Sequence, residues 1–196
     1  MAMANQEDFE GLAMQYTGEI YAHALRLTGN RSDAEDLVQE TFLKGYRGFA
    51  GFKSGSNLRA WLYRIATNNY INGYRAKKRR PETSDIDSMG EWALHARIGG
   101  LEKVAADITP EAIVMASITD DAVKAALDAL PDEFKQPVLL ADVDGFSYRE
   151  IAEILEIPMG TVMSRLSRGR KRLEVALFSL AVERGLVEPD PEAVNV

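Results

Sequence analysis

The side chains with the clearest chemistry lie in a basic segment near the C-terminal end. Residues 159–173 carry five cations and no acid, although the formal net charge of the 196-residue chain is −7. At about 100° per residue, cations and small polar residues share one side of a helix: Thr161, Ser164, Arg165, Arg168 and Arg172. Another side is expected to pack inward: Val162, Leu166, Gly169 and Leu173. Cations bind phosphates, and polar groups bind base edges. The segment predicts a helix that binds duplex DNA, and the alternative is a solvated basic surface.

A short helix is predicted directly before this segment. Ser147 and Glu150 have the spacing of a capping box, which satisfies unpaired amides where a helix begins. Pro158 ends this helix, because the residue before a proline is disfavoured in the helical conformation, and the next helix begins near Gly160. This is a helix-turn-helix arrangement. The turn commonly has glycine at its left-handed position, where this sequence has Glu156, at a cost of about 1 kcal/mol.

A second basic segment covers residues 57–80, with seven cations and no acid. One helical stripe combines an indole, three amides and two guanidiniums: Asn57, Trp61, Arg64, Asn68, Asn72 and Arg75. Rings stack on unpaired bases at roughly 1–3 kcal/mol each, cations follow phosphates and amides bind base edges. The stripe indicates single-stranded nucleic acid. The alternatives are that Trp61 is a core anchor and that the basic run is a solvated helix end.

Several carboxylates lie on a further predicted helix, in the run DAEDLVQETF at 33–42. Its buried side comprises Ala34, Leu37, Val38, Phe42, Tyr46 and Phe49, and its outer side Asp33, Asp36, Gln39, Glu40 and Lys44. Spaced carboxylates can serve acid–base or metal chemistry, but no histidine or nucleophile accompanies them. Acids in the first turn are also expected from the helix dipole. On these grounds alone the carboxylates form a solvated face.

The composition argues against several functions. The chain has no cysteine, and its two histidines, His23 and His95, lie far apart, so neither a metal site nor a cofactor is expected. No nucleophile–base pair or phosphate loop is recognisable, which argues against an enzyme with a small-molecule substrate. No run reaches the roughly 18 apolar residues of a membrane span, and the N-terminus does not resemble a signal peptide. We expect a cytoplasmic protein without membrane contact.

The elements that carry these residues are helical nearly throughout, which predicts an all-α fold. Two small helical domains are expected at 1–80 and 118–185, joined by a flexible acidic linker at 81–117 and followed by a frayed tail at 186–196. A second capping box, Ser32 with Glu35, is predicted to start a helix. The expected helices cover about 7–28, 32–49, 57–76, 120–130 and 132–143.

The motifs, in this order, resemble the extracytoplasmic-function (ECF) bacterial sigma factors. They are DAEDLVQETF (33–42), LRAWLYRIATN (58–68), ALP-x-EF (129–134) and GFSYREIAEIL…PMGTVMSRL…RGR (145–170). The resemblance covers about 8–80 and 118–180, and it is specific because independent motifs keep their order and spacing. It implies a sigma region 2 bundle, a region 4 helix-turn-helix, and a protein that lends promoter recognition and opening to core RNA polymerase.

The resemblance also implies residue roles. The run at 33–42 would then be a surface that binds the β′ clamp of core polymerase, rather than a solvated face. Its residues in the matching motif are Asp36, Leu37, Gln39, Glu40 and Phe42. Recognition of the −10 element, with a base flipped from the melted strand, falls to Asn57, Trp61, Arg64, Asn68, Asn69, Asn72, Tyr74, Arg75, Lys77, Lys78 and Arg79. Binding of the −35 duplex falls to Tyr148, Arg149, Thr161, Ser164, Arg165, Arg168, Arg170, Lys171 and Arg172.

The resemblance further implies control by an anti-sigma factor. GTVMSRL-x-RGR and ADVDGF-x-Y resemble the subgroup that answers thiol-oxidative stress, whose anti-sigma proteins contain zinc and respond to redox state. Met163 departs from the arginine or lysine common at its position. The main rival is a stand-alone helix-turn-helix regulator that acts as a dimer, although no dimerisation heptads or effector domain are recognisable. A structural adaptor with solvated basic faces is a third possibility.

Overall fold

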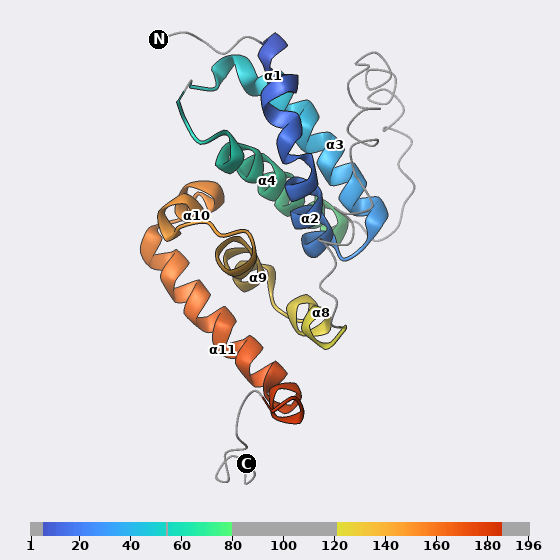
Figure 1. Ribbon diagram of the computed structural model, residues 1–196, viewed down its shortest axis with the longest axis vertical. Coiled ribbons are helices and arrows are strands. Elements are labelled where there is room, and N and C mark those ends of the chain that lie inside the picture. The colour runs from blue at the N-terminus through green and yellow to red at the C-terminus, as the bar shows by residue number, and fades with distance from the viewer. Residues whose placement is uncertain (1–5, 54, 80–120, 186–196) are drawn as a thin grey trace. The chain divides into compact units, whose positions relative to one another are not determined.

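The computed structural model describes residues 6–53, 55–79 and 121–185 (Figure 1). Every regular element in these ranges is a helix, so the predicted all-α class is confirmed for the part of the chain described. These helices form two compact units. The predicted linker at 81–117, the tail at 186–196 and Arg80 lie outside the described residues. So do the side chains of Tyr74, Arg75, Lys77, Lys78 and Arg79, although the helical backbone is described to Arg79.

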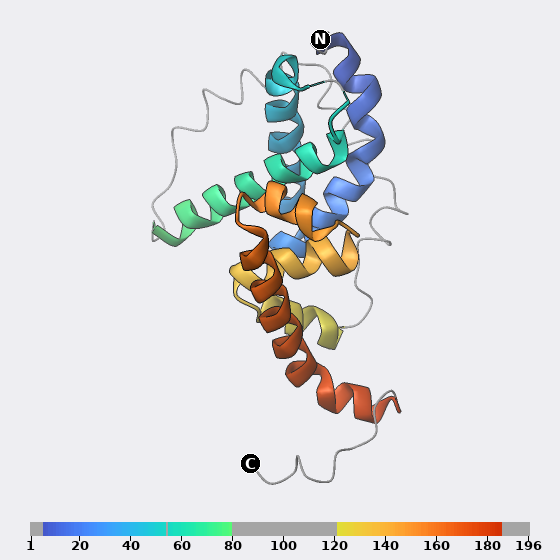
Figure 2. The same ribbon diagram turned by 90° about the vertical axis from the view of Figure 1, so that its left-hand side faces the viewer.

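The first unit is a bundle in which a central helix packs against its neighbours on two sides (Figure 1; Figure 2). Its elements are α1 (Gln6–Ala13), the 3₁₀ turn η1 (Met14–Tyr16), α2 (Thr17–Thr28), α3 (Arg31–Gly48), the 3₁₀ turn η2 (Phe49–Gly51) and α4 (Leu58–Arg79). The central helix is α3, which contacts both α2 and α4. The sequence predicted one helix over 7–28, whereas η1 divides this segment into α1 and α2.

Aromatic rings fill the space between α1 and α3. The ring of Phe9 meets those of Phe42, Tyr46 and Phe49 edge-on, with centroids 6.3, 6.0 and 5.2 Å apart. Edge-to-face pairs of this kind stabilise a core beyond the area that they bury. Gly45 permits the close approach, because a Cβ there would lie 2.9 Å from the Phe9 ring. Tyr46 was predicted to be buried, but it is 37% exposed although it packs against Phe9.

The start of α3 corrects the second capping prediction. Asn30, not Ser32, is the N-cap residue: its extended backbone precedes the helix, and its side-chain Oδ1 accepts a hydrogen bond of 2.9 Å from the Asp33 amide. Ser32 already lies within the first helical turn. The Asn30–Asp33 spacing is itself a capping signal, because asparagine is among the strongest N-cap residues.

Removing this cap is expected to destabilise the first unit. Asn30→Ala should lower the free energy of unfolding by about 1 kcal/mol, because one amide at the start of α3 loses its acceptor. Ser32→Ala is the matched control and should change stability much less. Chemical denaturation of both variants, followed by circular dichroism, measures the difference. Equal effects of the two substitutions would contradict the assignment of Asn30.

The second unit contains α8 (Asp121–Asp128), α9 (Asp132–Val138), the π-helical turn η3 (Leu139–Val143), α10 (Tyr148–Leu155) and α11 (Met159–Glu183). The long helix α11 packs along α9 and α8. Of its predicted inward side, Val162, Leu166 and Gly169 are buried, whereas Leu173 is half-buried. A Cβ on Gly169 would lie 2.8 Å from Val138 Cγ2 and 3.3 Å from the Phe134 carbonyl oxygen. Glycine therefore sets how closely α11 approaches α9.

The helix-turn-helix prediction is confirmed in its local details. The Ser147 amide donates to Glu150 Oε2 over 2.9 Å, and the Glu150 amide donates to Ser147 Oγ over 3.3 Å, which completes the predicted capping box at the start of α10. Glu156 has a φ of 55°, the left-handed conformation expected of the turn. The following helix begins at Met159, directly after Pro158. None of the helices in the described ranges is both long and apolar enough to cross a membrane.

Candidate nucleic-acid interface

The polar stripe predicted on α4 lies at least partly in solvent. Asn57, Arg64 and Asn72 are exposed, and Trp61 and Asn68 are half-buried, whereas the opposite side of α4 is buried at Leu62 and Ala66. Asn57 also starts the helix, since its Oδ1 accepts a hydrogen bond of 3.1 Å from the Ala60 amide. The stripe thus presents polar groups outward from a helix whose other side packs in the core.

Aromatic rings surround the indole of Trp61. Phe52 lies at a centroid distance of 5.2 Å from it, and Phe49 stacks on Phe52 at 5.5 Å with nearly parallel planes. Gly48 lies against the six-membered ring of the indole, where a Cβ would be 3.5 Å from Trp61 Cζ2. Trp61 therefore packs against its own unit while part of the ring stays accessible. The two roles considered for it, core anchor and stacking platform, are compatible.

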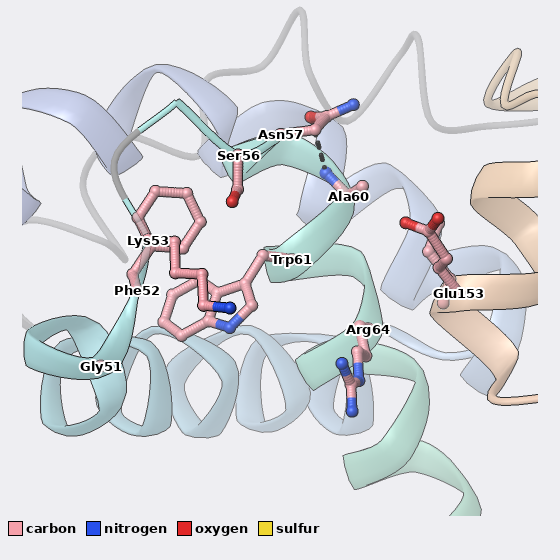
Figure 3. A pocket seen from close by; sticks show the side chains of 10 residues that line it. Gly51, Phe52, Lys53, Ser56, Asn57, Ala60, Trp61, Arg64 and Glu153 are labelled. Atoms are coloured by element: carbon pink, nitrogen blue, oxygen red, sulfur yellow. Dashed lines mark hydrogen bonds between the residues drawn. The ribbon is translucent and has the colours of Figure 1, made fainter. Parts of the chain in front are cut away.

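Three residues for which no role was predicted lie beside this indole. Figure 3 shows Phe52, Lys53 and Ser56 gathered around Trp61, with Arg64 one turn further along α4. They belong to the connection between α3 and α4, for which no function was predicted. An aromatic residue next to a cation, directly before an acid-free helix, was the signal that would have identified Phe52 and Lys53.

Asn69 does not share the exposed stripe with its neighbours. It is buried between α3 and α4, where its Oδ1 accepts a hydrogen bond of 2.7 Å from Lys44 Nζ. Lys44 Nζ also lies 2.5 Å from Glu40 Oε1. The carboxamide of Asn69 thereby orients a cation and a carboxylate on the α3 surface, whereas Asn68 and Asn72 remain available at the α4 surface.

The candidate partner surface on α3 is smaller than its motif. Asp36 and Glu40 are exposed and Gln39 is half-buried, so these three can reach another molecule. Leu37 and Phe42 are buried in the core of the first unit. The two apolar residues can affect an interface only by holding α3 in position.

The candidate duplex-binding residues lie on α10 and α11. Tyr148, Arg149, Ser164, Arg168, Arg170, Lys171 and Arg172 are exposed, and Thr161 and Arg165 are half-buried. The buried side of α11 anchors the helix on α9, so its outward residues are held in fixed register. A helix presented in this way, after a turn, can enter a major groove.

Several of these cations have partners within the second unit. Arg170 donates to both carboxylate oxygens of Asp142, over 3.0 and 2.6 Å, and to the Tyr148 hydroxyl over 3.3 Å. The bond to Asp142 and then that to Tyr148 hold the pKa of the Arg170 guanidinium above its ordinary value, so the group stays charged. The Arg172 guanidinium lies 4.8 Å from the centre of the Phe134 ring.

The remaining cations are held more loosely. Arg165 lies 3.9 Å from Glu133, and Lys171 lies 3.1 Å from Glu174. Arg168 has no ion-pair partner among the residues that the structure describes. Exposed ion pairs contribute about 0–1 kcal/mol, so phosphate groups can replace these carboxylates at little cost. Within the described ranges, no group of three or more histidine and acidic side chains is placed to hold a metal ion.

Comparisons with known proteins match both units. The family models "Sigma-70 region 2" and "Sigma-70, region 4" match residues 12–80 and 120–173. The "ECF RNA polymerase sigma factor SigE" of Mycolicibacterium smegmatis is 36% identical over 171 residues, which are 87% of this chain and 62% of that protein. The "ECF RNA polymerase sigma-E factor" of Escherichia coli K12 is 34% identical over 170 residues, covering 87% and 86%.

Among solved structures, the sigma factor RpoE of Bartonella quintana, in complex with the anti-sigma factor NepR, has a TM-score of 0.64 and 28% sequence identity. This match covers 87% of the present chain and 97% of the other. CnrH, in complex with the cytosolic domain of CnrY, has a TM-score of 0.58 at 23% identity and supports the fold alone.

Proposed function

The chain belongs to the ECF RNA polymerase sigma factors, and on this premise we propose how its surfaces divide the work of transcription initiation. It binds core RNA polymerase in the cytoplasm, recognises the −35 and −10 promoter elements and promotes opening of the DNA. Region 2 is assigned to 1–80, region 4 to 118–185 and the linker to 81–117. The observation that carries the proposal is that an acidic chain bears one acid-free basic segment in each of its two helical units.

The −35 duplex is bound by the second unit. The outward side of α11 supplies Thr161, Ser164, Arg165 and Arg168 toward base edges, and exposed cations toward phosphates. Arg170 reaches a phosphate only by leaving Asp142 or by carrying that carboxylate with it. Its triad with Asp142 and Tyr148 therefore positions α11 on α10 as well as supplying charge.

The −10 element is bound, as melted single strand, by the start of α4 and the connection before it. The accessible part of Trp61 provides a stacking surface, while Lys53 and Arg64 attract phosphates. Asn68 and Asn72 offer amide groups to an unpaired base edge. We assign Asn69 to the support of α3, through Lys44, and not to base contact, because its carboxamide is buried.

Core polymerase is bound by the α3 surface that contains Asp36, Gln39 and Glu40. Charged residues exposed on a rigid helix suit a protein partner whose basic residues face them. Leu37 and Phe42 act through packing alone. The acidic surface on α3 repels DNA, whereas the two basic segments attract it, so the polymerase contact and the DNA contacts are made by different surfaces.

An anti-sigma factor is proposed as the regulator, since a similar sigma factor was solved in complex with one. The finer proposal is the thiol-oxidative-stress subgroup, supported by the motif GTVMSRL-x-RGR, with a zinc-containing, redox-sensitive anti-sigma partner. Affinity capture of the chain from cells with and without an oxidant tests it. A small cysteine-rich partner should give way to core polymerase subunits after oxidation, and an unchanged set of partners would contradict the subgroup.

Run-off transcription with purified core polymerase tests the function itself. The expected result is a sequence-dependent transcript that requires both the chain and the core enzyme. If core polymerase yields no such transcript, the proposal fails. Tight binding to a palindromic duplex without polymerase, seen by gel shift, would favour the stand-alone regulator instead.

Arg168→Ala is expected to weaken binding of the holoenzyme to −35 DNA by roughly tenfold, because a charged contact to DNA disappears. The plot of log affinity against log salt separates the two modes of contact. A phosphate contact predicts a slope smaller by about 0.9 and equal losses on all sequences, whereas a base contact relaxes specificity at one position. Arg31→Ala, which removes an exposed arginine from α3, is the control. Equal losses for both variants would contradict a role for Arg168.

A further inference from the structure

Two methionines at the start of α11 have no buried role. Met159 and Met163 are 53% and 52% exposed, although Val162, between them in sequence, is fully buried. Residues four apart lie on the same side of a helix, so the two side chains form one short apolar edge. Ser164, the next residue after Met163 and about 100° further round the helix, is also exposed, so the methionine edge and the polar residues of α11 belong to one solvent-facing side.

The surroundings of the methionine edge indicate what it contacts. Met163 lines an open hollow together with Tyr148, Arg170 and Lys171, and Glu174, an acid that also lines the hollow, is paired with Lys171 over 3.1 Å. Segment 159–173 has no acid, and two of its cations, Arg170 and Lys171, lie beside Met163 in this hollow. A polyanion complements this charge, whereas an apolar protein surface would have to desolvate the cations without replacing their partners. Duplex DNA is therefore the occupant that the charges favour.

Duplex DNA offers one strongly apolar group in the major groove, the C5-methyl of thymine. We infer that Met163, with Met159 beside it, contacts a thymine methyl in the −35 element and so selects a T·A pair at that position. The inference rests on the proposed function, since it requires α11 to lie in the major groove of that element. Methionine suits this role because its unbranched, polarisable side chain adapts to an irregular apolar surface.

Deoxyuridine provides the test, because it lacks only the methyl group and keeps the hydrogen-bonding edge of thymine. The −35 sequence is first selected from randomised promoter duplexes with the holoenzyme, and each thymine is then replaced singly by deoxyuridine in a binding assay. At one or two positions the wild-type affinity should fall about fourfold, which corresponds to one methyl group withdrawn from water. Met163→Ala should abolish this penalty and weaken binding to the thymine duplex by a similar factor. Met163→Leu should keep the penalty.

Val175→Ala is the control, because Val175 is an exposed apolar residue on the same helix, 68% exposed, outside the methionine edge. It should leave the deoxyuridine penalty intact. The inference is overturned if the selected element contains no thymine, if no thymine shows a penalty, or if the penalty persists in Met163→Ala. A holoenzyme that selects no −35 sequence at all would overturn the proposed function, which is a separate outcome.

Discussion

Gly169→Val should unfold the second unit at temperatures where the native chain is stable. A Cβ at position 169 would lie 2.8 Å from the Val138 side chain and 3.3 Å from the Phe134 carbonyl oxygen. The backbone oxygen cannot move without displacing α9. We expect a loss of about 3 kcal/mol, at the upper end of overpacking costs, and a melting temperature lower by more than about 10 °C for a unit of this size.

Gly160→Ala is the matched control, since it adds a Cβ to the same helix where no atom lies within 4 Å. Its stability should be unchanged or raised by up to about 1 kcal/mol, because alanine favours the helix. Hydrogen exchange of the full chain, read separately for α9 with α11 and for α3 with α4, shows which unit is destabilised. Equal protection of α11 in the two variants would contradict the packing argument. Transcription with Gly169→Val should lose dependence on the −35 sequence.

Local periodicity was sufficient to predict the helical class and most of the inward side of α11, but not the break at η1. Val162, Leu166 and Gly169 recur at helical spacing, so their common side follows from the sequence alone. The reason why position 169 must be glycine does not, because the obstacle is Phe134, 35 residues earlier in the chain. Spacing identifies which side of a helix packs, whereas the partner of that side depends on the tertiary fold.

The candidate sites were predicted less completely, for the same reason. Asn69 was grouped with Asn68 as a base contact, but it packs against α3, where its partner Lys44 lies 25 residues away. Leu37 and Phe42 belong to a motif that includes exposed carboxylates, and only burial separates the supporting residues from the accessible ones. The cap at Asn30 was the exception, since its spacing to Asp33 could have been recognised from the sequence.

Trp61→Ala should lower affinity for single-stranded −10 DNA by about tenfold or more, because a base loses its stacking surface, worth about 1–3 kcal/mol. The same substitution should destabilise the first unit by about 2 kcal/mol, less than for a fully buried tryptophan, since the indole also packs against Phe52. The two effects are separable because binding can be measured at a temperature where the variant is still folded. Trp61→Phe should restore most of the stability and part of the binding.

Tyr46→Ala is the control for this experiment. Tyr46 is another partly exposed aromatic residue of the first unit, and from α3 it packs against Phe9 of α1 rather than beside Trp61. It should therefore destabilise the unit without weakening binding to the single strand. If the Trp61 and Tyr46 variants lose affinity equally when both are folded, Trp61 is only a core anchor. A promoter that is already melted across the −10 element distinguishes holding of the unpaired base from melting. If the holoenzyme with Trp61→Ala also binds this promoter weakly, the indole holds the unpaired base, because melting in advance does not restore the affinity.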